Sequence, residues 1–228
     1  PGISGIKVDP RVAIRIQIKN NSKVKFSYSL THQFLHLLTT NGSGIPSDIW
    51  VPSTSSIKPE KSMHFSIGGF HEISGYEFSA EVYFKKMDGL IMYKPGSNLI
   101  SINDWQESIE TGGSGFSRGI ELLIKKTQGK NTGWIGYSLS KNERQFSGIN
   151  NGEKFPFKYD QRHEIDLSLN HKFNDRIEFS SSWVFTSGNA LTIATKTYPA
   201  IDVDYYSRST EGNDPFFHEA NFYNGFTL

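Results

Sequence analysis

The sequence predicts an all-β protein, and more specifically an antiparallel up-and-down transmembrane β-barrel. Apolar residues recur at every second position in eight segments, short and long connections alternate along the chain, and no helical periodicity of useful length occurs. No apolar run approaches the ~20 residues of a membrane-spanning helix, which excludes a helical inner-membrane protein. The mean hydropathy of −0.45 is compatible with a barrel, because lumen and loop residues lower its average.

The first predicted strand covers residues 11–19, where Val12, Ile14, Ile16 and Ile18 occupy every second position between mainly polar residues. Strict alternation of β-branched residues indicates a strand with one apolar face. The second predicted strand begins near Val24 and continues to about residue 37. Six further segments repeat the pattern: residues 62–67, 76–93, 120–125, 135–140, 164–170 and 177–185. The chain therefore predicts about eight strands.

The connections between these segments fall into two length classes. Short turns rich in Asn, Asp and Gly lie at residues 20–22, 71–75, 127–132 and 172–176, as tight hairpins require. Long polar segments lie at residues 39–61, 94–115, 141–160 and 187–228. Because the two classes alternate, an up-and-down sheet would have all short turns at one edge and all long connections at the other.

Alternation alone is shared by a soluble β-sandwich and a membrane barrel, but three features favour the barrel. Two predicted strands, 24–37 and 76–93, are much longer than the ~5–6 residues typical of soluble strands. Aromatic residues near strand ends, predicted to lie on the apolar side, suggest the aromatic girdles of a membrane barrel; they are Tyr28, Tyr76, Phe84, Trp134, Trp183 and Phe185. The polar rows carry carboxylates, as a water-filled lumen requires, and the predicted lumen-facing residues are Glu77, Glu81, Glu121, Glu164, Asp166 and Glu178.

A series of longer motifs then points to a family. They are Asp9–Arg11, Tyr28–Leu38, Ile45–Pro52, Ile57–Glu60, Glu81–Ile91, Gly119–Lys126, Gly133–Ser140, Phe155–His163 and Thr186–Asn189. In their order and spacing, these motifs resemble the β-barrel of TonB-dependent outer-membrane receptors, particularly the large Bacteroidetes-type receptors that include the SusC-like branch. The resemblance covers the chain from Asp9 to about Gly188.

The resemblance implies a Gram-negative outer-membrane location and a 22-stranded barrel that holds an N-terminal plug domain. Residues 1–228 would then be one partial barrel domain, from the C-terminal half, without the plug and the closing strands. It also implies active transport of a scarce ligand, such as a siderophore, vitamin, glycan or peptide. The implied partners are outer-membrane lipid, the rest of the receptor, TonB with its inner-membrane energising complex, and optionally a surface lipoprotein.

No motif indicates an enzyme, a metal site or a cofactor. The chain has no Cys and a net charge of +1, so thiolate metal sites are excluded and a nucleic-acid partner is not expected. His32 and His36 lie four residues apart in one extended segment, and we interpret them as interface or lumen histidines. Asp160, Arg162 and His163 are interpreted as structural polar residues at the rim.

The predicted ligand-binding residues lie in two long connections. These are Asp48 and Trp50 in the first, and Asn103, Asp104, Trp105 and Gln106 in the second. Aromatic and amide side chains on loops suit sugars, peptides or siderophores, although Trp50, between Pro46 and Pro52, could simply pack its loop. Two alternatives remain open: a stand-alone eight-stranded outer-membrane barrel acting as an adhesin or pore, and a soluble β-sandwich that binds carbohydrate.

Overall fold

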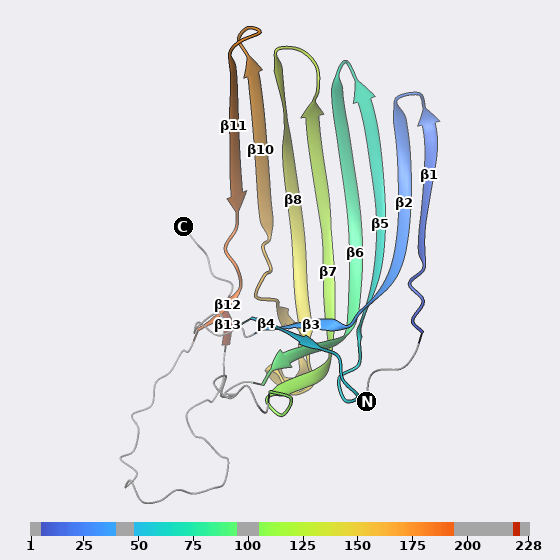
Figure 1. The fold of residues 1–228 in the computed structure, drawn as a ribbon, viewed down its shortest axis with the longest axis vertical. Coiled ribbons are helices and arrows are strands. Elements are labelled where there is room, and N and C mark those ends of the chain that lie inside the picture. The colour runs from blue at the N-terminus through green and yellow to red at the C-terminus, as the bar shows by residue number, and fades with distance from the viewer. Residues whose placement is uncertain (1–5, 40–47, 95–104, 194–220, 224–228) are drawn as a thin grey trace, which may run out of the picture.

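The computed structural model describes residues 6–39, 48–94, 105–193 and 221–223, and in this part of the chain the protein is all-β with one short 3-10 turn, η1 (Asn150–Gly152). Eight strands follow one another in sequence order in a single antiparallel sheet (Figure 1). They are β1 (Arg11–Lys19), β2 (Ser22–Gln33), β5 (Glu60–Ile73), β6 (Tyr76–Tyr93), β7 (Ile109–Lys126), β8 (Asn131–Gln145), β10 (His163–Lys172) and β11 (Glu178–Thr186). A ninth, β9 (Phe155–Pro156), pairs with β8.

All eight predicted strands are confirmed, as is the grouping of the short turns at one edge of the sheet (Figure 1). Within the part of the chain that the structure describes, the sheet is open: β1 pairs with β2 alone and β11 with β10 alone. The described residues contain no helix that is long and apolar enough to cross a membrane.

The prediction of one continuous strand to residue 37 is wrong. β2 ends at Gln33, which pairs with Glu60 at the very start of β5, so the ladder has no partner beyond this point. The chain then turns into β3 (Leu35–Leu38), which forms a separate hairpin with β4 (Ile49–Pro52). A second short pair, β12 (Leu191–Ile193) and β13 (Asn221–Tyr223), lies outside the main sheet.

The register places the apolar rows of all eight strands on one face of the sheet. Across neighbouring strands Ile14 lies opposite Phe26, Phe26 opposite Ile67, and Ile67 opposite Val82. The row continues through Ile120, Leu139 and their neighbours to β11. We call this surface the apolar face, and the opposite one the polar face. The side chains that would meet inside a sandwich are exposed instead: Ile14 by 56%, Phe65 by 45%, Phe78 by 38% and Leu167 by 41%.

The polar face is the more enclosed of the two. Along the first half of β6, the residues of the apolar row are exposed, whereas the alternating polar residues Glu77, Ser79 and Glu81 are half-buried. A water-soluble sheet has the reverse pattern. Trp134 is a correction to the predicted girdle, since it lies opposite Lys125 and Ser168 on the polar face.

Among the described residues, buried apolar side chains gather only where the long connections lie. One cluster joins Met87, Leu90 and Met92 of β6 to Phe146, Ile149 and Phe155. A second cluster packs Leu38, Val51 and Ile57 against Ile91 and Ile109. Because Ile91 alternates with Leu90 and Met92 along one strand, the two clusters lie on opposite faces. Within the described residues, the middle of the sheet has no buried apolar residue on either face.

Gly133 offers a test of the register between β8 and β10. Its φ of +152° and the approach of Ser168, whose carbonyl oxygen would lie 2.1 Å from an added Cβ, leave no room for a side chain. We expect Gly133→Ala to lower the free energy of unfolding by about 1–3 kcal/mol, measured by urea titration in detergent micelles. Gly69→Ala is the matched control, because nothing lies within 4 Å of its added Cβ. Equal losses for both variants would contradict this register.

Candidate functional site

The long-connection end of the sheet carries the residues predicted to bind ligand. The β3–β4 hairpin crosses this end in front of the long strands (Figure 1), and its inner face packs on the ends of β6 and β7 through Leu38 and Val51. Residues 105–108 and 146–162 fold onto the same end and complete the platform. We call this surface the loop platform.

Asp48 ties two parts of the loop platform together. Its Oδ1 lies 2.8 Å from Lys158 Nζ, and Tyr159 donates a hydrogen bond from its hydroxyl to Oδ2. Burial lowers the pKa of Lys158, but the hydrogen bond and the negative charge of Asp48 outweigh it and raise this pKa overall. The same carboxylate raises the pKa of the Tyr159 hydroxyl, first through their hydrogen bond. Asp48 therefore already has two partners in the protein.

Trp50 is the aromatic residue that the loop platform presents to solvent. It pairs with Leu37 on the outer face of the hairpin and is 61% exposed, while Val51 on the inner face is buried. The interpretation that Trp50 simply packs its loop is therefore wrong. An exposed Trp on a rigid hairpin is suited to stacking against a planar or sugar ligand.

The ligand-binding residues predicted in the second long connection differ in their burial. Trp105 is partly buried and packs against the apolar cluster beneath the hairpin. Gln106 is exposed and accepts a hydrogen bond of 3.3 Å from the Ser56 hydroxyl. Asn103 and Asp104 lie outside the described residues. The structure thus brings Gln106 close to the segment that follows Trp50, and leaves Trp105 a mainly structural position.

The two histidines predicted to share one extended segment belong to different sheets. His32, in β2, bonds through Nδ1 to Asp9 Oδ1 at 2.7 Å, and this bond lowers the pKa of Asp9. His36, in β3, is 1% exposed; its Nε2 contacts the Ser53 hydroxyl at 3.0 Å, and its Nδ1 has no hydrogen-bond partner. Burial lowers the pKa of His36. Among the described residues, no three His, Cys, Asp or Glu side chains gather as metal ligands would.

Asp160 holds the rim where β8 meets β10. It is 3% exposed, accepts a 2.6 Å hydrogen bond from the Asn142 amide, and pairs with Arg162 Nε at 2.9 Å. Burial raises the pKa of Asp160, although the Asn142 amide and Arg162 oppose this effect. His163 contacts the Tyr137 hydroxyl at 2.9 Å. These contacts agree with the interpretation of the three residues as structural, which stays a prediction.

All six predicted lumen carboxylates share the polar face. Glu81 lies directly opposite Glu121, and the same row continues through Ser138 to Glu164. Glu77 faces Lys125, Asp166 faces Gly136, and Glu178 faces Lys172. Like charges in adjacent positions destabilise a sheet unless water or a counter-charge surrounds them. A hydrated surface is the environment that this row of carboxylates requires.

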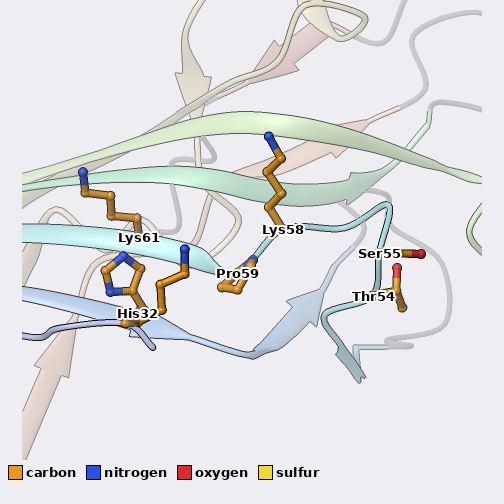
Figure 2. Close-up of a pocket in the computed structure, with 7 residues that line it drawn as sticks. His32, Thr54, Ser55, Lys58, Pro59 and Lys61 are labelled. Atoms are coloured by element: carbon orange, nitrogen blue, oxygen red, sulfur yellow. The ribbon is translucent and has the colours of Figure 1, made fainter. Parts of the chain in front are cut away.

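A basic cavity of about 400 Å³ was not predicted from the sequence (Figure 2). Its lining includes Lys7, His32, Lys58 and Lys61. They come from the segment before β1, from β2, from the connection that leads into β5, and from the start of β5. The only local sequence signal is the spacing of Lys58 and Lys61. The other members meet them only because β2 and β5 are neighbours in the sheet.

Comparison with known proteins does not assign this chain to a family. No protein-family model matches the chain, and no curated protein matches it. The two faces of the sheet and the loop platform are therefore the features that bear on function.

Removing the Asp48 carboxylate tests whether its contacts to Lys158 and Tyr159 stabilise the loop platform. Asp48→Ala should lower the local stability of residues 155–160 by about 1–2 kcal/mol, because Lys158 and Tyr159 both lose a partner. Hydrogen exchange at the Phe157 and Asp160 amides should then accelerate by roughly 5–30-fold. Asp175→Ala is the control, since the Asp175–Lys172 pair is solvent-exposed and should change exchange by less than about twofold. Unchanged hydrogen exchange in Asp48→Ala would show that the contacts of Asp48 to Lys158 and Tyr159 do not stabilise this segment.

The buried His36 predicts a pH-dependent hairpin. Since folding lowers its pKa, the neutral imidazole is favoured in the folded state, and the stability it contributes is lost as pH falls below its ordinary value of about 6.5. Exchange protection of the β3 and β4 amides should decrease by up to about tenfold per pH unit between pH 6.5 and 5. In His36→Gln, which cannot titrate, protection should not vary with pH, and a dependence like that of the parent would assign the effect to another group.

Proposed function

We propose that this chain forms part of the wall of a TonB-dependent active transporter in the outer membrane of a Gram-negative bacterium. In this proposal the apolar face contacts lipid, the polar face lines an aqueous lumen, and the loop platform faces the cell exterior. The observation that carries the proposal is the exposure pattern of the sheet, in which the apolar rows are largely exposed while four of the alternating carboxylates are half-buried: Glu77, Glu81, Glu164 and Asp166.

The physical argument starts from the size of the apolar face. Soluble monomers rarely expose contiguous apolar patches beyond a few hundred Å², whereas here exposed Val, Ile, Leu and Phe side chains cover one face of eight adjacent strands. A bilayer removes that surface from water at roughly 25 cal/mol per Å². The run from Tyr76 to Phe84 also approaches the ~9–11 residues that a membrane strand needs.

The open edges support a wall segment over a self-contained barrel. β1 and β11 each have one unpaired side, and unpaired strand edges are not tolerated in hydrocarbon. Further strands must therefore flank this sheet if it lies in a membrane. This favours part of a larger barrel over a stand-alone eight-stranded barrel, and together with the family resemblance it supports a 22-stranded receptor.

The two faces of the sheet and the loop platform would have different roles in transport. A scarce ligand would meet the loop platform, where Trp50 and Gln106 are exposed, and would then pass along the hydrated row of Glu81, Glu121 and Glu164. TonB would supply the energy by pulling on a plug domain. The wall contributes shape, hydration and ligand contacts, and no covalent chemistry. A surface lipoprotein partner belongs to the same proposal.

Site-directed spin labelling tests the orientation of the faces. Because the 228 residues contain no Cys, Phe65→Cys, Ser66→Cys and Ile67→Cys each introduce one labelling site in them. In the intact protein recovered from the outer-membrane fraction, we expect labels at positions 65 and 67 to collide mainly with oxygen. The label at position 66 should collide mainly with a water-soluble nickel complex, because lipid-facing and lumen-facing residues alternate.

One result would contradict the proposed orientation of the two faces, and a second would contradict the proposed membrane location. A soluble sandwich would protect positions 65 and 67 from both reagents, and the intact protein would then remain monodisperse without detergent. The receptor assignment has its own test in the intact coding region, which should encode a plug domain upstream and at least three further strands downstream. Absence of both would leave a small barrel as the better proposal.

A further inference from the structure

The basic cavity beside β2 and β5 has no role in the proposed transport path. It is lined by Lys7, His32, Lys58 and Lys61, together with Thr54 and Ser55. Figure 2 shows the side chains of Lys58 and Lys61 extending to the same side, with His32 beside Lys61 on the neighbouring strand. Its volume of about 400 Å³ is sufficient for a phosphate group and the sugar or glycerol that carries it.

The lysine ammonium groups of the cavity are unpaired within the described residues. None of its three lysines forms an ion pair there, and the Ser55 hydroxyl has no hydrogen-bond partner there. Two carboxylates lie close by, but both have partners: Asp9 bonds to His32, and Asp88, opposite Lys61, pairs with Lys86 at 3.5 Å. The cavity therefore presents free ammonium groups and a free hydroxyl to an anion.

The register places this cavity at the end of the apolar face. His32 follows Leu30 by two residues and Lys61 precedes Met63 by two, so both side chains lie in the apolar rows about 7 Å beyond the last apolar position. Exposed Ile6 and Val8 flank Lys7, and exposed Phe34 follows β2. Cationic groups beside exposed apolar residues, one step outside the hydrocarbon, lie at the level of lipid headgroups.

We propose that this cavity binds the phosphate of an anionic lipid headgroup in the leaflet on the long-connection side. Ammonium groups act as point charges for phosphate, and the neighbouring apolar side chains would contact the acyl chains of the same lipid. A freely diffusing phosphate would use the lysines but not the apolar border. The inference rests on the proposed membrane orientation of the apolar face.

Lipid binding by the intact protein tests the inference. Native mass spectrometry in a neutral detergent would measure binding of phosphatidic acid, of phosphatidylcholine, and of inorganic phosphate as a competitor. We expect Lys58→Gln/Lys61→Gln to weaken phosphatidic acid binding by at least about tenfold. Lys126→Gln/Lys130→Gln removes the same charge at the short-turn end and should leave binding within about twofold.

The outcomes separate the inference from the function on which it rests. Equal losses in both double variants would overturn the cavity as a specific site, and full competition by millimolar inorganic phosphate would overturn the lipid as its source. If labels at positions 65 and 67 meet oxygen but phosphatidic acid does not bind selectively, only the headgroup site fails. If those labels show no lipid contact, the membrane orientation fails and the headgroup site fails with it.

Discussion

The contact between the apolar face and its surroundings is the interaction on which the rest of the structure depends. The middle of the sheet has no buried core in the described residues. Backbone hydrogen bonds join the strands there, but no described part of the protein packs against their apolar side chains. A sheet of this kind is stable only where another phase or another chain removes that surface from water. Lipid meets this requirement without any further folding of the chain.

The long-connection end follows a different principle. There the protein builds its own small cores, one on each side of the sheet, and the β3–β4 hairpin is held by Leu38, Val51 and Ile57. Asp48 and Asp160 add charged hydrogen bonds that join segments far apart in the sequence. This end can therefore be rigid in water, as the proposed ligand contact would require, whereas the proposed membrane location would place the rest of the sheet in hydrocarbon.

The two candidate binding features occupy this boundary for different reasons. Trp50 is exposed because its hairpin has an inner face that is satisfied by packing and an outer face that has no partner in the described residues. The basic cavity exists because the apolar rows of β2 and β5 end at His32 and Lys61, where polar residues take over the same face. In the proposed membrane orientation, both features lie at the level where the protein would pass from lipid to water.

The sequence by itself determined the strands, their order and the identity of the two faces, because alternation is a local property of an extended chain and adjacent strands joined by tight turns must pair. It also determined that Glu81, Glu121 and Glu164 share a face, since each lies next to a residue of the apolar row. Only the tertiary structure decided that β2 ends at Gln33, that Trp50 is exposed while Trp105 packs, and that Lys58 and Lys61 meet His32. These outcomes depend on where a ladder loses its partner and on which distant segments pack together, and neither is encoded in the period of any single strand.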